Sequence, residues 1–189
     1  MKAICQSVFA PRSLPANEAG YALVTRYGWL LIVVRWTYYS VLFQFRDYGG
    51  KWAMFVPPPF RVDVDTYARL QRSLSLPFGI VLMLLLALAL VGYLRLLGKH
   101  ASFATTLNIL GTTFFLPFVL AQPLDQAIMA LVGWRLVPVT LLHTAILAWE
   151  SWAAVEVLSA SHDLRLAERL GGIAVLGGVW IGIAGSLWR

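Results

Sequence analysis

The sequence predicts an all-α, polytopic integral membrane protein, folded as a bundle of five transmembrane helices. Of its 189 residues, 59% are hydrophobic and only 13% are charged, and the mean hydropathy is +0.72. A chain of this composition has too few polar side chains to cover a water-soluble core. Each crossing uses about 20 residues, so five crossings leave no room for a sizeable soluble domain. We therefore expect one membrane domain, residues 27–189, after a short N-terminal segment, residues 1–26.

The five expected crossings are runs of apolar residues about as long as a bilayer is thick. They cover residues 27–43, 76–97, 103–122, 137–158 and 171–187. The first has aromatic residues at both ends, as interfacial anchors do, and Arg35 near its middle. The second contains the unbroken run "IVLMLLLALALVGYL". In the third, Thr105, Asn108 and Thr112 recur on one helix face, which should point into the bundle, and Pro117 interrupts the helical hydrogen bonds.

Two stretches outside the crossings carry structural signals of their own. Residues 4–10 predict a short turn on the membrane surface, which Pro11 ends. The first connector, residues 44–73, contains the turn-forming strings "YGG" and "VPPPF", and Asp65 or Thr66 is expected to cap the helix that follows. This connector is either a folded cap on the outer surface or an interfacial loop with its aromatic residues among the lipid headgroups.

The fourth crossing, "LLHTAILAWESWAAVEVL", places His143, Glu150 and Glu156 in an otherwise apolar helix. His143 and Glu150 share a helix face but are about 10.5 Å apart along the axis, too far to bind one metal ion together. A lone ionised carboxylate near the middle of a crossing costs several kcal/mol, so Glu150 needs a cation or a proton. Arg35 is the only basic residue deep in an expected crossing, and we predict an Arg35–Glu150 ion pair flanked by His143 and Asn108. Glu156 lies on another face near the helix end, where we expect it to reach headgroups or water.

The buried polar cluster, defined as Arg35, Asn108, His143 and Glu150, has two interpretations. In the favoured one, the cluster fixes the register of helices, because lipid provides no hydrophobic force between them. In the other, it lines a polar cavity and marks a path for an ion, a proton or a substrate. An intramembrane protease is disfavoured, because the chain has no serine-elbow motif and its histidine and glutamate lack metalloprotease spacing.

The fifth crossing carries a ridge of small residues, each four positions from the next. They are Ala174, Gly178, Gly182 and Ser186. Such a ridge allows another helix to approach closely. We expect helix packing within this chain, with packing against a second copy as the alternative.

The formal net charge of +6 indicates contact with anionic lipid headgroups, and we expect no nucleic-acid partner. The short basic turns at residues 95–99 and 165–169 favour a cytoplasmic N-terminus. The single Cys5 gives no signature of a disulfide, a metal site or a nucleophile, and we expect no cofactor and no metal. The expected partners are membrane lipids and other membrane proteins, and a second copy of the chain is a further candidate.

From Tyr67 onward the chain resembles a bacterial member of the Yip1 family. The resemblance is carried by "YARLQRSLSLPFG" before the second crossing, by "GKHASFATTLNILGTTFFLP" around the third, and by Asp125 after it. It continues in "LLHTAILAWESW" and in a closing helix that ends at Arg189. It therefore extends over about two thirds of the chain and rests on the order and spacing of these stretches.

The resemblance implies a five-crossing domain with a cytoplasmic N-terminus, in a bacterial cytoplasmic (inner) membrane. Eukaryotic relatives act in vesicle traffic and contact small Rab-type GTPases, but this chain lacks the "DLYGP" motif of that branch. The family offers no catalytic residues. We therefore expect a non-enzymatic scaffold or adaptor that binds other membrane proteins. The alternative is a small channel, carrier or lipid-translocating protein that uses the buried polar cluster.

Overall fold

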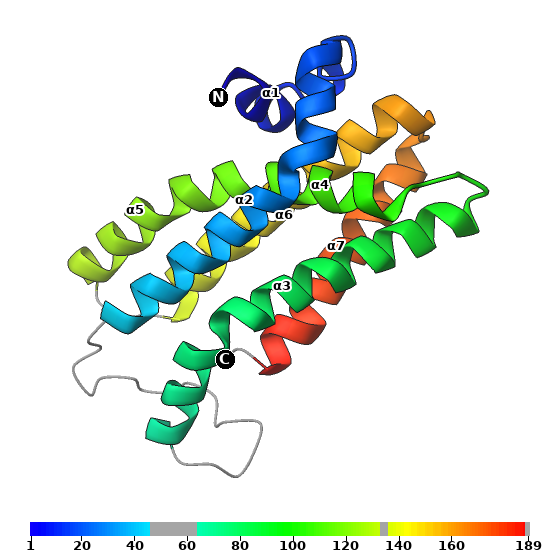
Figure 1. The fold of residues 1–189 in the computed structure, drawn as a ribbon. Coiled ribbons are helices and arrows are strands. Elements are labelled where there is room, and N and C mark those ends of the chain that lie inside the picture. The colour runs from blue at the N-terminus through cyan, green and yellow to red at the C-terminus, as the bar shows by residue number, and fades with distance from the viewer. Residues whose placement is uncertain (46–63, 133–135, 188–189) are drawn as a thin grey trace.

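The computed structural model describes residues 1–45, 64–132 and 136–187, and this part of the chain is all-helical (Figure 1). Its elements are α1 (Lys2–Phe9), the 3₁₀ turn η1 (Pro11–Ser13), α2 (Glu18–Phe45), α3 (Val64–Leu96), α4 (Phe103–Thr113), α5 (Phe115–Val132), α6 (Leu136–His162) and α7 (Leu166–Leu187). The long helices form one bundle, and α1 lies at its edge beside the start of α2.

Four stretches of the described residues are long and apolar enough to cross a membrane. They are Ser73–Leu96, Phe103–Leu124, Thr140–His162 and Leu166–Ile183. This is compatible with a multi-pass membrane protein, and it matches four of the five expected crossings. The expected crossing without a match is the first, residues 27–43. It lies inside α2, which is not among the four stretches. The expected count of five crossings is therefore not confirmed.

The third crossing is divided into two helices. Helix α4 ends at Thr113 and α5 begins at Phe115. Pro117 has no N–H group, so the Thr113 carbonyl loses the donor that a continuous helix would supply. In addition, the Thr113 hydroxyl donates to the carbonyl of Ile109 at 2.9 Å, one turn earlier. The interruption predicted at Pro117 thus becomes a break at Phe114.

Other helix bounds also differ from those expected. Helix α2 begins at Glu18, so the expected domain boundary at residues 26 and 27 lies inside one helix. Helix α3 begins at Val64, before both predicted capping residues, and α5 continues to Val132. The two interpretations of the first connector remain predictions, because most of it lies in residues 46–63, outside the described residues.

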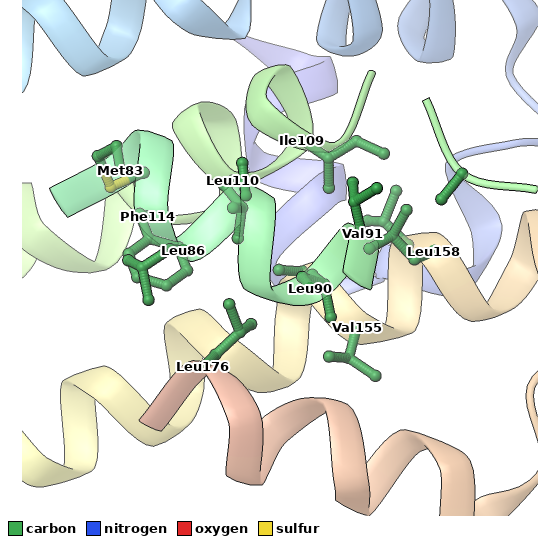
Figure 2. Close-up of a cluster of buried hydrophobic side chains, with 14 of the residues drawn as sticks. Met83, Leu86, Leu90, Val91, Ile109, Leu110, Phe114, Val155, Leu158 and Leu176 are labelled. Atoms are coloured by element: carbon green, nitrogen blue, oxygen red, sulfur yellow. The ribbon is translucent and has the colours of Figure 1, made fainter. Parts of the chain in front are cut away.

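The hydrophobic core lies where α3, α4, α6 and α7 meet (Figure 2). On α3, Leu82, Leu86, Leu90 and Leu94 are spaced four apart and are at most 1% exposed. Around them lie Ile109, Leu110, Phe114, Val155, Leu158 and Leu176. One face of α3 therefore lies at the centre of this core, to which α2 also contributes Val24, Ile32 and Trp36.

The N-terminal residues form a helix and a turn that pack against the bundle. Helix α1 contacts α2 and α6, and η1 contacts α6. Val8 of α1 and Leu14, directly after η1, are fully buried. A turn lying on the membrane surface was expected at residues 4–10. In the structure, part of this stretch is instead covered by other helices of the chain.

Candidate functional site

Arg35 of α2 and Glu150 of α6 form a buried ion pair. The Arg35 Nη1 atom lies 2.8 Å from Glu150 Oε1, and their side chains are 8% and 2% exposed. The two residues are 115 positions apart in the sequence. Helices α2 and α6 therefore bring together the only pair of opposite charges that the apolar segments suggested.

Arg35 also reaches the break between α4 and α5. Its Nη1 group donates to the carbonyl oxygen of Phe114, the residue between the two helices. The guanidinium carbon lies 4.6 Å from the ring centroid of Phe118, a distance typical of a cation–π contact. One arginine thus joins α2 to α6, to the α4–α5 break and to the first turn of α5.

Some polar atoms around this pair have no hydrogen-bond partner within the described residues. They include Arg35 Nε, Trp36 Nε1 and Ser151 Oγ, which are all buried. An unsatisfied buried polar atom costs about 1–3 kcal/mol, so these atoms are the ones most able to bind a small polar molecule.

Asn108 makes a separate set of polar contacts between α2 and α4, which we call the Asn108 joint. Its side-chain oxygen accepts from the backbone N–H of Trp29 at 2.8 Å, and its side-chain nitrogen donates to the carbonyl of Thr25 at 2.8 Å. These two backbone groups are four residues apart, so they are the ones that pair with each other in a regular helix. Asn108 thus bridges one step of the α2 hydrogen-bond ladder, and α2 changes direction along its length (Figure 1).

Two glycines allow α2 and α4 to approach closely at this joint. A Cβ atom on Gly28 would collide with the backbone of Asn108, and one on Gly111 would collide with the Gly28 carbonyl. Trp29 is about 9 Å along α2 from Arg35, at 1.5 Å per residue. The predicted cluster therefore divides into an Arg35–Glu150 joint and an Asn108 joint.

His143 lies on α6, seven positions before Glu150, and is half-buried. It is close enough to interact electrostatically with Glu150. Its position agrees with a flanking role on the same helix face, at about 10.5 Å along the axis.

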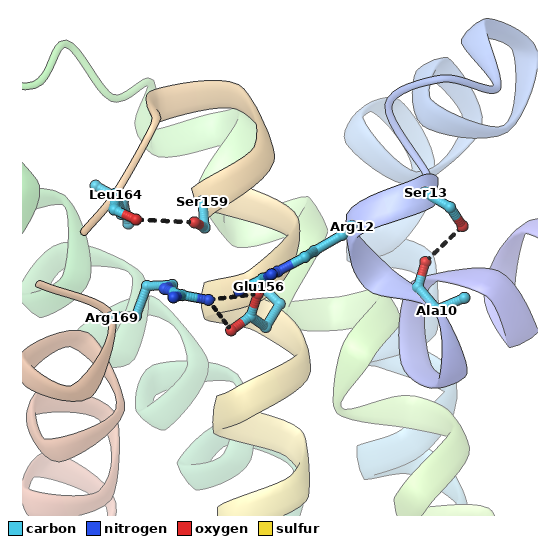
Figure 3. Close-up of polar contacts among 7 residues, drawn as sticks. All are labelled: Ala10, Arg12, Ser13, Glu156, Ser159, Leu164 and Arg169. Carbon is cyan, nitrogen blue, oxygen red and sulfur yellow. Dashed lines mark hydrogen bonds and ion pairs between the residues drawn. The ribbon is translucent and has the colours of Figure 1, made fainter. Parts of the chain in front are cut away.

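Glu156 is the one acidic side chain whose predicted position was wrong. It is 5% exposed and binds two arginines, Arg12 of η1 and Arg169 of α7 (Figure 3). The Arg169 Nη1 atom lies 2.9 Å from Glu156 Oε1 and 3.3 Å from Oε2. Headgroups or water were expected there because Glu156 lies near the end of its helix, on a different face from Glu150. The signal in the sequence that could have shown this contact is that Glu156 and Arg169 lie on either side of the turn between the fourth and fifth expected crossings.

The ridge of small residues on α7 is exposed at Ala174 and Gly178. In the described part of the chain, no atom lies within 4 Å of a Cβ placed on Gly178. The side chain of Ser186 lies outside the described residues. Helix α7 instead buries the face that carries Gly172 and Leu176. Packing within this chain and packing against a second copy therefore both stay predictions.

The described residues contain no group of three or more His, Cys, Asp or Glu side chains that could hold a metal ion. No protein-family model, no curated protein and no solved structure matches the chain. The polar contacts between helices are therefore the features of this chain that bear on its function.

Proposed function

We propose that this protein is a non-enzymatic membrane scaffold or adaptor of the Yip1 type, which binds other membrane proteins. The observation that supports this proposal is the set of contacts that Arg35 makes with other helices of the chain. Its guanidinium binds Glu150 of α6 and the Phe114 carbonyl between α4 and α5. Each of these contacts joins parts of the same chain, so the charges stabilise the arrangement of helices and are not held ready for a substrate.

The surfaces available to partners are the outward faces of the helices. In the candidate span Leu166–Ile183, only 11% of the most apolar window is buried, compared with 44–56% in the other three spans. Among the four candidate spans, α7 therefore has the largest uncovered share, which is available to lipids, to other membrane proteins or to a second copy. The residues Ala174 and Gly178 on this surface permit close approach of a partner helix.

A small channel, carrier or lipid-translocating protein is the alternative. It is favoured by the buried Arg35 Nε and Ser151 Oγ atoms, which have no hydrogen-bond partner in the described part of the chain. A polar path through the bundle would satisfy these atoms, and intramembrane charged residues often mark such paths.

Flux through reconstituted liposomes separates the two functions. Ion and lipid flux are measured for the wild type, for Glu150→Gln and for Arg26→Gln, which changes an exposed arginine of the same helix as Arg35. The scaffold proposal expects no flux in any of the three and a loss of thermal stability or of self-association in Glu150→Gln alone. Flux in the wild type that disappears in a folded Glu150→Gln protein would instead establish a conduit.

The proposed topology keeps α2 as a fifth crossing, with the N-terminus in the cytoplasm of a bacterium. Helix α2 has 28 residues and is therefore about 42 Å long, more than the hydrocarbon thickness of about 30 Å. Its central charge, Arg35, is compensated by Glu150. Tags at the two ends of the chain test this topology, because five crossings put them on opposite sides of the inner membrane and four put them on the same side.

A further inference from the structure

Two arginines share one buried carboxylate near the end of the bundle where α6 meets α7. Figure 3 shows Arg12 of η1 and Arg169 of α7 both reaching Glu156 of α6. We call these three residues the Glu156 triad. Its two positive charges and one negative charge leave one positive charge that the triad itself does not compensate. Beside an apolar bundle, where charges are weakly screened, such an excess favours the binding of an anion.

The Glu156 triad also has hydrogen-bond donors that its own carboxylate does not use. Arg12 binds Glu156 through Nε, and its Nη1 and Nη2 groups make no hydrogen bond within the described residues. The Arg12 side chain is 63% exposed, so these two groups are accessible from outside. Arg169 binds Glu156 through Nη1, and its buried Nε has no partner in the described part of the chain. Because a guanidinium group binds phosphate through two parallel N–H bonds, the open edge of Arg12 matches a phosphate group.

Further basic residues lie at the same end of the bundle. Arg95 and Lys99 are at the end of α3 and in the turn that follows. Lys99 is close enough to His162, the last residue of α6, to interact with it electrostatically. Arg165 is exposed in the turn between α6 and α7. An anion at the Glu156 triad would therefore lie in a positive field, as the phosphate groups of anionic lipids do beside basic membrane-proximal segments.

The position of the Glu156 triad favours a lipid phosphate over a phosphate in solution. Arg169 is three residues after the start of the candidate span Leu166–Ile183, and Glu156 is six residues before the end of the span Thr140–His162. At 1.5 Å per residue these positions are about 4.5 Å and about 9 Å from the span ends, close to the boundary between headgroups and hydrocarbon. Leu166 and Leu170, on the adjoining face of α7, are 63% and 57% exposed. The acyl chains of a lipid bound here would cover these apolar side chains.

We propose that the Glu156 triad binds the phosphate group of an anionic phospholipid. Arg12 and Arg169 are the phosphate-binding groups, and Glu156 holds their guanidinium groups in place. This inference goes beyond the proposed function and is the same for a scaffold and for a conduit, because the lipid binds on the outside of the bundle.

Native mass spectrometry of the full chain in a neutral detergent counts bound lipids and tests the proposal. Phosphatidylglycerol and phosphatidylcholine of equal chain length are titrated separately into the wild type, Arg12→Gln and Arg26→Gln, the last of which removes an exposed arginine of α2. We expect the wild type and Arg26→Gln to prefer phosphatidylglycerol. Arg12→Gln should bind phosphatidylglycerol about fivefold more weakly, the effect of one arginine at a membrane surface, and phosphatidylcholine as before.

A second variant and a competitor complete the test. Arg12→Lys keeps the charge but lacks the paired N–H groups, so it should also weaken phosphatidylglycerol binding and serves if Arg12→Gln does not fold. Inorganic phosphate at the same concentration as the lipid should not displace it. Equal affinity of the wild type for the two lipids would overturn the proposal, and so would unchanged phosphatidylglycerol binding in the Arg12 variants. Displacement by inorganic phosphate would show a site for free phosphate and would overturn the assignment to a lipid.

Discussion

Replacing one partner of the Arg35–Glu150 pair should destabilise the fold far more than replacing both. The side chains are 8% and 2% exposed, so neither charge can be solvated by water when its partner is lost. Removing one member of such a buried pair costs about 3–5 kcal/mol, whereas exchanging both for apolar residues is often neutral or stabilising. We expect Arg35→Met and Glu150→Leu each to show the large loss. The double variant should be close to the wild type, which corresponds to a coupling energy of about 3 kcal/mol or more.

The two single variants should also differ from each other. When Arg35 is lost, the carboxyl group of Glu150 can bind a proton and become neutral. When Glu150 is lost, the guanidinium of Arg35 cannot release its proton, and its remaining contacts are the Phe114 carbonyl and the aromatic rings. Glu150→Leu should therefore be the more damaging of the two.

Reversible unfolding in mixed micelles measures these free energies, with Arg26→Met as a control for loss of an exposed arginine from α2. Losses in the two single variants that simply add in the double variant would refute the coupling. Exchanging the two charges is a weaker test. A carboxylate at position 35 would face the carbonyl oxygen of Phe114 and the ring of Phe118, both of which favour a cation.

Three further predictions concern the helix contacts. Asn108→Ala should lower the free energy of unfolding by about 1–3 kcal/mol, because the N–H of Trp29 loses its acceptor; chemical denaturation measures it, and a loss of zero would contradict the bridging role. Gly28→Ala should lower the melting temperature sharply, because its Cβ would meet the Asn108 backbone, while Gly92→Ala, with no atom within 4 Å, should leave it unchanged or raise it. Gly178→Leu should leave the melting temperature of the monomer unchanged, because the added side chain enters open space. A fall in the melting temperature of the monomer would show that this surface is covered within the chain.

The sequence was sufficient to suggest the Arg35–Glu150 pair, because both charges stand alone in apolar segments. In such a segment the energetic cost of an unpaired charge leaves few solutions, and a unique basic residue and a unique central acidic residue are expected to meet. An interruption of the third crossing at Pro117 was predicted in the same way, since proline removes a specific hydrogen bond, and the structure has the break at Phe114. These features depend on local chemistry that is visible in the sequence.

The position of Glu156 and the face of α7 could not be predicted in this way. Both depend on how helices are rotated and on where the N-terminal residues pack, and neither follows from spacing. A ridge of residues such as Ala174 and Gly178 permits close packing but does not show which side of the helix the bundle covers. In the structure, the face with Leu176 is covered instead, and α7 contacts both α3 and α6.

The two buried glutamates of α6, Glu150 and Glu156, differ in the number of arginines that bind them among the described residues. Arg35 and Glu150 form a one-to-one pair between two long helices, so its separation leaves two buried charges and is strongly opposed. At Glu156 two arginines share one carboxylate, and one of them, Arg12, is largely exposed. Loss of Arg12 therefore leaves the second arginine in place and exposes no new buried charge.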